Sequence, residues 1–392
     1  MPSVALASPA SLAVPATPAA RLAPIDLLRG TVMLLMLLDH VRETFYLHHP
    51  VGDPMEVEGT APALFVARTL AHLCAPVFVF LTGLSAWLYA SRQADGRAAA
   101  ARFLLKRGLF LIVLELTLVN LAWSGAFPPQ ALYLQVIWVI GLSMLALAAL
   151  LWLPLPALAL LGAALVALLD AVQVQGDGPL AAAWAVLHDR RWLELGELRL
   201  RTSYPVLPWI GVIALGYAAG PWYGAATDPA HRQQRLLAWG LGALAGFHLL
   251  RWHNGYGDAP WQAQDDLAHT AMSFFNVTKY PPSLQFLLLT LGVGLLLLRL
   301  YEHPAVARTL APLATIGAAP MFFYLLHLYV LKLAYLAALA LWGANQGDLF
   351  GVDSVAALWT IAALLGLALY WPTAAFARLK ARRRDLGWLR YF

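Results

Sequence analysis

Long apolar runs separated by short polar segments dominate the chain. The runs lie near residues 24–47, 63–90, 102–123, 132–153, 155–173, 204–223, 235–251, 283–301, 319–342 and 352–376. A helix needs roughly 20 apolar residues to cross about 30 Å of hydrocarbon, and it satisfies its own backbone hydrogen bonds there. The pattern therefore predicts an all-α fold, a polytopic membrane helix bundle of about ten transmembrane helices.

The junction between the fourth and fifth runs decides the topology. Leu153-Pro154-Leu155-Pro156 predicts a break, because proline cannot donate a helical hydrogen bond. If one helix ran through 132–173 instead, the membrane orientation of every later segment would be reversed. The basic residues favour the break, because about 17 of the 26 lysines and arginines then face the cytoplasm. We therefore predict that both termini are cytoplasmic.

Composition agrees with a membrane protein. The chain is 61% hydrophobic and 12% charged, with a mean hydropathy of +0.67, whereas soluble domains are about one quarter charged. The net charge is +5, but the basic residues lie between apolar runs, which argues against a nucleic-acid partner. A single cysteine, Cys74, excludes an intramolecular disulfide. We expect a disordered tail over 1–20, a transmembrane domain over 21–380 and a basic cytoplasmic tail over 381–392.

The first apolar run carries the strongest candidate site, because ionisable side chains are costly inside a membrane. Asp26, Arg29, Met33, Met36 and His40 recur at steps of three and four, which places them on one helix face. Arg29 and His40 would lie roughly 16 Å apart along the axis. An arginine suits a phosphate, and a histidine suits general-base or acyl-carrying work. The competing interpretation is that the two residues only mark the membrane interfaces.

Five segments of the chain resemble landmarks of a known family. They are residues 21–30 (RLAPIDLLRG), 74–83 (CAPVFVFLTG), 204–209 (YPVLPW), 276–282 (NVTKYPP) and 322–327 (FFYLLH). Together with Asp39-His40, they resemble the heparan-α-glucosaminide N-acetyltransferase-like family of bacterial membrane proteins. The resemblance extends over nearly the whole chain from Arg21.

That resemblance implies a transmembrane acyltransferase of the bacterial inner (plasma) membrane. Such an enzyme moves an acetyl or other acyl group from cytoplasmic acyl-CoA to a periplasmic, saccharide-like acceptor. Acetyl-CoA or another acyl-CoA would be the co-substrate, the bilayer the surrounding partner, and no metal is expected. The resemblance leaves a homodimer open.

The resemblance also leaves two catalytic histidines in competition. The Arg29-to-His40 interval is similar to a motif of membrane acyltransferases that decorate bacterial surface polysaccharides. Lysosomal members of the family instead place their catalytic histidine after the first helix, near His48 and His49 here. His40 is favoured because it lies on the same helix face as Arg29. Asp39, next to His40, is the third catalytic candidate.

Other residues receive binding roles on the same basis. The candidates for acyl-CoA are Arg29, Asp26, Lys106 and Arg107, and those for the acceptor are Arg42, His72, Asn276, Lys279 and Tyr280. Lys106 and Arg107 also fit plain markers of the cytoplasmic side. Asp39 could pair with Arg42, and His72, one turn before Pro76, could be a helix-packing residue.

A transporter or flippase is the alternative function, because charges within spanning segments can line a permeation path. Glu115 and Lys332 are two further charges of this kind. The chain shows no internal repeat of the sort that transporters often have. It also lacks metal-ligand spacing, a phosphate-binding glycine loop and a nucleophile elbow. A protein that keeps the fold without the activity is a third interpretation.

Overall fold

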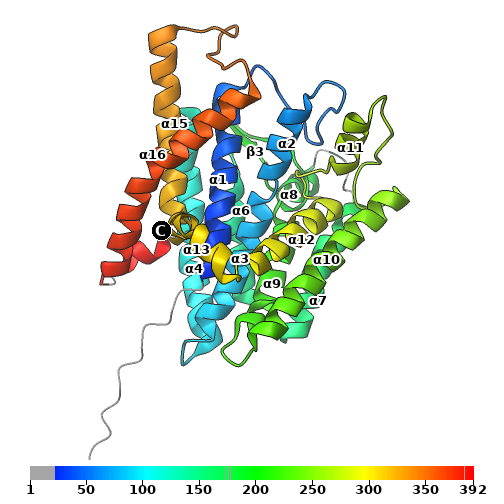
Figure 1. Ribbon diagram of the computed structural model, residues 1–392, viewed down its shortest axis with the longest axis vertical. Helices are drawn as coiled ribbons and strands as arrows, with labels where there is room; N and C mark the ends of the chain where they lie inside the picture. The colour runs from blue at the N-terminus through cyan, green and yellow to red at the C-terminus, as the bar shows by residue number, and fades with distance from the viewer. Residues whose placement is uncertain (1–22, 173, 175, 177, 384) are drawn as a thin grey trace, which may run out of the picture.

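The computed structural model describes residues 23–172, 174, 176, 178–383 and 385–392, and it is mostly helical (Figure 1). The predicted tail over 1–20 lies outside the described residues. The helices are α1 (Ala23–Phe45), α2 (Pro62–Ala71), α3 (Cys74–Ala90), α4 (Gly96–Leu114), α5 (Asn120–Ser124), α6 (Val136–Leu150), α7 (Leu155–Ala167), α8 (Pro179–Leu187), α9 (Val206–Ala218), α10 (Pro229–His253), α11 (Leu267–Phe275), α12 (Leu284–Leu300), α13 (Pro304–Thr309), α14 (Ala311–Ala318), α15 (Pro320–Trp342) and α16 (Val355–Arg382). A π-helical turn, η1 (Glu115–Val119), joins α4 to α5.

Within the described residues, four helical stretches are long and apolar enough to cross a membrane. They are Pro62–Ala90, Val206–Tyr223, Pro320–Trp342 and Val355–Arg382. The shorter apolar helices α6, α7 and α12 accompany them. These lengths and compositions indicate a membrane protein, and the number of about ten crossings stays a prediction.

Prolines interrupt two of the apolar runs, one of them at the break that the sequence predicts. α6 ends at Leu150 and α7 begins at Leu155, with Pro154 at the N-cap position, so one continuous helix over 132–173 is excluded. The run over 63–90 is likewise divided into α2 and α3. Pro76 has no N–H to give to the carbonyl of His72, which is why the backbone breaks there.

The all-α expectation is wrong in one segment. The long loop before α9 folds into a hairpin of β2 (Trp192–Leu195) and β3 (Leu198–Arg201), and β1 (Ala131–Tyr133) pairs with β3 in parallel. The alternation of leucine and charged residues in β3 has the period of a strand. The two strands are too short to stand out among longer apolar runs. The sheet carries Arg201 to the candidate site described below.

α1 lies in the middle of the molecule, with α15 and α16 on one side and α10 and α12 on the other (Figure 1). Its backbone touches that of α14 through two glycines. A Cβ on Gly30 would clash with the carbonyl of Leu313, and a Cβ on Gly317 would clash with the carbonyl of Asp26. Small residues let helices approach this closely in membrane proteins. The close contact fixes the position of α1, and with it the helix face that carries Arg29 and His40.

We expect Gly317→Ala to destabilise the protein by about 1–3 kcal/mol, because the added methyl must push two backbones apart. The matched control is Gly242→Ala in α10, where a Cβ has no neighbour within 4 Å. Thermal unfolding of the purified protein in detergent measures both. Equal midpoints for the two variants would show that α1 and α14 are not in close contact.

The long loops at one end of the bundle are tied together by specific hydrogen bonds. Arg251, at the end of α10, is buried and donates to the carbonyls of Ser273, Phe274 and Asn276. Asn276 exchanges two hydrogen bonds with the backbone of Met55. The loop over 276–283 is therefore held against the loop that follows α1.

Candidate active site

A cavity of about 1030 Å³ runs alongside α1. Its walls include Met33, Met36, His40 and Glu43 from that helix, which span about 15 Å along the helix axis. Other walls come from α3, α4, α6, α15, the sheet and the loop at 279–280. We call its two extremities the Arg107 end and the Lys279 end, after lining residues at each.

His40 projects into this cavity and pairs with a second histidine. Its Nδ1 lies 2.7 Å from Nε2 of His327 on α15. Nδ1 of His327 lies 3.0 Å from the carbonyl oxygen of Phe323. A carbonyl can only accept, so His327 carries its proton on Nδ1 and its Nε2 accepts from His40. In the neutral pair this leaves Nε2 of His40 with a free lone pair.

The His40 ring is also fixed by aromatic neighbours. Trp123 meets it edge-on with ring centroids 5.1 Å apart, and Tyr324 does so at 6.2 Å. Nζ of Lys332 donates to the carbonyl oxygen of Trp123 at 3.2 Å. Lys332, one of the unexplained charges in the sequence, thus anchors the segment that carries Trp123.

Asp39 is held in ion pairs. Its Oδ1 accepts from Nε of Arg42 at 2.9 Å, which confirms the predicted pairing, and its Oδ2 accepts from Arg68 at 2.6 Å. Arg42 also contacts Glu43 at 3.0 Å. With two guanidinium partners, Asp39 is suited to orient this end of α1 and not to accept a proton. Arg68 was missed, although an arginine inside an apolar run is a signal of the same kind as Arg29.

Glu115 also has a structural explanation. Its Oε2 accepts from the backbone N–H groups of Ile137 and Trp138, both at 3.1 Å. These are orphan donors of the first turn of α6, and a carboxylate is favourable at a helix N-terminus. Glu115 therefore caps α6 beside the π-helical turn η1.

At the Arg107 end, the four predicted acyl-CoA residues divide into two groups. Arg107 lines the cavity, whereas Lys106 is exposed and does not line it. Arg29 donates to Asp26 at 2.9 Å and to Oγ of Ser85 at 2.5 Å. Neither Arg29 nor Asp26 lines the cavity, but Arg29 lies close enough to Arg107 for their charges to interact.

At the Lys279 end, Lys279 and Tyr280 line the cavity, as does Arg42. The hydroxyl of Tyr280 donates to that of Tyr204 at 3.1 Å, and burial holds the pKa of Tyr204 well above its usual range. Asp53 accepts from the backbone N–H groups of Lys279 and Tyr280. Burial raises the pKa of Asp53, and these two donors lower it in part.

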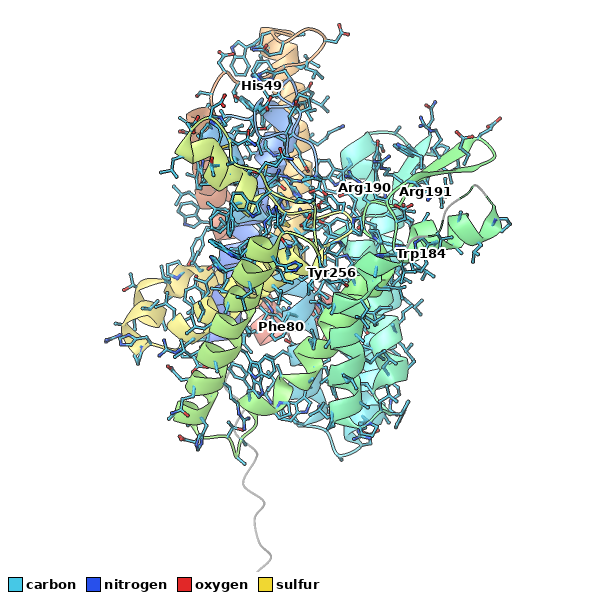
Figure 2. The ribbon with its side chains drawn as sticks, turned by 90° about the vertical axis from the view of Figure 1, so that its right-hand side faces the viewer. His49, Phe80, Trp184, Arg190, Arg191 and Tyr256 are labelled. Carbon is cyan, nitrogen blue, oxygen red and sulfur yellow. The ribbon has the colours of Figure 1, made fainter. Side chains whose placement is uncertain are left out.

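The remaining predicted residues are placed away from His40. His49 is exposed, lines the cavity and packs against Tyr46, with ring centroids 4.7 Å apart and the rings tilted. His72 is buried against Phe286 and does not line the cavity. Asn276 does not line it either, since its amide is engaged with Met55. Figure 2 shows His49, Arg190 and Arg191 toward one end of the molecule and Phe80 lower among the helices.

Comparison with known proteins identifies the family of the chain. Residues 21–250 match the family model described as heparan-alpha-glucosaminide N-acetyltransferase, catalytic. None of the curated proteins matches the chain significantly. The matched segment contains His40, Arg68 and Arg107, and it ends before Lys279 and His327. Because the match covers more than half of the chain, the protein belongs to the heparan-α-glucosaminide N-acetyltransferase catalytic-domain family.

Proposed function

We propose that the protein is a transmembrane acetyltransferase that uses acyl-CoA at the Arg107 end and an amino or hydroxyl group of a saccharide at the Lys279 end. The observation that carries the proposal is a single cavity that contains Arg107, His40 and Lys279. We further propose that the Arg107 end faces the cytoplasm of a bacterium and that both termini lie there, in keeping with the distribution of basic residues.

In this proposal, Nε2 of His40 removes the proton from the acceptor as the acceptor attacks the thioester carbonyl. The C–S bond breaks, CoA leaves as a thiolate, and the proton on His40 passes to that thiolate. In the two-step route, Nε2 itself attacks the thioester and CoA leaves as a thiolate. The acceptor then displaces His40 from the acyl-imidazolium, and the proton of the acceptor passes to the thiolate. Both routes need the tautomer of His40 in which Nε2 carries no proton.

We propose His327 as the positioning residue for that tautomer. Its Nε2 accepts the Nδ1–H of His40, and this hydrogen bond strengthens when His40 becomes an imidazolium. Asp39 plays no direct part in this arrangement, because Arg42 and Arg68 occupy both its oxygens. The residue that fixes the catalytic imidazole therefore comes from α15 and not from α1.

The proposed reaction is tested with purified protein in nanodiscs, labelled acetyl-CoA and glucosamine as the acceptor. We expect labelled N-acetylglucosamine to accumulate together with free CoA. A transporter or flippase would leave acetyl-CoA intact. Absence of both acetyl transfer and acetyl-CoA binding would overturn the proposed function.

Arg107→Ala should lower the affinity for CoA by roughly tenfold or more, since a guanidinium gives phosphate several charge-assisted hydrogen bonds that alanine cannot replace. Arg29→Ala should act in the same direction, because Arg29 adds positive charge at this end. Lys106→Ala is the matched control, an adjacent cation that is exposed. Isothermal titration with CoA measures all three. An effect of Lys106→Ala equal to that of Arg107→Ala would mean that net surface charge alone attracts CoA.

A further inference from the structure

The Lys279 end of the cavity holds a buried cation whose charge interacts with those of Asp39 and Asp53 but which, among the described residues, forms no ion pair with either. Lys279 is 4% exposed and lines the cavity. Among the described residues, none forms a hydrogen bond or an ion pair with its Nζ, and its recorded contact is with the face of Tyr280, 5.1 Å from the ring centroid. An ammonium that faces a cavity without a bonded carboxylate can bind an anionic ligand there.

Two arginines lie at the same end of the cavity. The guanidinium of Arg190 lies 4.6 Å from the centroid of the Tyr280 ring, and that of Arg201 lies 5.3 Å from the centroid of the Trp192 ring. Both residues line the cavity, and Nε of Arg190 is buried without a partner among the described residues. Burial lowers the pKa of Arg201, and the like charge of Arg190 adds to this effect. The two guanidiniums are therefore close to each other.

The nearby carboxylates are already engaged. Asp189 is paired with Arg191, whose Nε and Nη2 lie 2.9 and 2.5 Å from Oδ2. Asp53 accepts from two backbone N–H groups, and Asp39 is held between two arginines. Among the described residues, no carboxylate forms an ion pair with Lys279, Arg190 or Arg201, and all three cations line the cavity.

We propose that Lys279, Arg190 and Arg201 form an anion subsite that binds a phosphate group carried by the saccharide acceptor. A phosphate carries close to two negative charges and three acceptor oxygens, which match three cations better than a single carboxylate does. Tyr280 and Trp192 add aromatic faces beside the subsite. Because Lys279 and His40 line the same cavity, one acceptor can reach both. This inference rests on the proposed function for the identity of the acceptor.

The phosphates of acyl-CoA are the other source of the same chemistry. They are assigned to the Arg107 end, and the lining of the cavity extends about 15 Å along α1 from there toward Lys279. If the assignment is correct, changes at Lys279 alter the binding of a sugar phosphate and leave CoA binding unaffected.

The test uses the full-length protein in nanodiscs without acyl-CoA, titrated with glucosamine 6-phosphate, glucosamine and glucuronate. We expect the wild-type protein to bind glucosamine 6-phosphate roughly tenfold or more tightly than the other two. In Lys279→Gln and in Arg201→Gln the ratio of the affinity for glucosamine 6-phosphate to that for glucosamine should fall toward one. Lys279→Arg should keep most of it. The matched control is Arg191→Gln, a neighbouring arginine that is paired with Asp189 and does not line the cavity, and it should keep the preference in full.

Three results would overturn the subsite. They are equal affinities for glucosamine and its phosphate in the wild-type protein, a loss in Arg191→Gln as large as in Lys279→Gln, and a Lys279→Gln protein that loses CoA instead of sugar phosphate. Glucuronate binding as tightly as the sugar phosphate would contradict the phosphate assignment. Thermal unfolding checks that each variant is folded, and Arg201 lies on the sheet, outside the helical core. A wild-type protein that binds the sugar phosphate through Lys279 but neither binds acetyl-CoA nor transfers acetyl would refute the proposed function alone.

Discussion

His40→Asn should reduce the kcat of acetyl transfer to glucosamine by about 10² to 10⁴ while leaving the affinity for acetyl-CoA nearly unchanged. Asparagine can still donate to Nε2 of His327 from a position close to that of the imidazole Nδ1, but it has no basic nitrogen in the place of Nε2. The substitution therefore removes the base and keeps the hydrogen bond that connects α1 to α15. Transfer of labelled acetyl and titration with CoA measure the two quantities separately.

The matched control is His49→Ala. His49 is exposed and lines the cavity, where its ring contacts Tyr46 and His48, so its loss should not disturb the fold. Loss of transfer in His49→Ala with near-normal transfer in His40→Asn would move the catalytic role to His49 and keep the reaction class. If neither variant loses transfer, histidine base catalysis is refuted.

His327→Phe should also reduce kcat by about 10² or more, with little change in the KM for acetyl-CoA. Without an acceptor for Nδ1–H, His40 can place its proton on Nε2, where it can no longer act as a base, and loss of a tautomer-fixing partner has large effects on enzymes of this type. His327→Gln offers a carbonyl oxygen to His40 and should restore part of the rate. Steady-state kinetics with acetyl-CoA and glucosamine separate kcat from KM.

A purely structural role for His327 predicts a different pattern. Phenylalanine has a similar size and also suits an apolar helix face, so packing alone would be preserved as well by His327→Phe as by His327→Gln. Equal rates for these two variants, both near that of the wild-type protein, would show that His40 does not depend on His327.

The sequence predicts features that depend on neighbours in the same segment. The apolar runs predict helices, because burial in lipid leaves few other backbone structures. The prolines at 154 and 156 predict the end of α6, and the three-residue spacing of Asp39 and Arg42 predicts their ion pair, which the structure confirms. The placement of His40 on a stripe with Met33 and Met36 follows from helical periodicity, and all three line the cavity.

The tertiary structure alone decides how distant segments meet around the face of α1 that carries His40. His40 and His327 are 287 residues apart, and Asp39 and Arg68 are 29 apart on different helices. These contacts depend on which helix faces pack together, and the close approach of Gly30 and Gly317 that sets one such packing is invisible in a hydropathy pattern. The sequence by itself determined a helical membrane protein with a charged first helix. Only the packing of the chain determined which cations keep an unpaired charge in the cavity, because burial and partners are properties of the assembled fold.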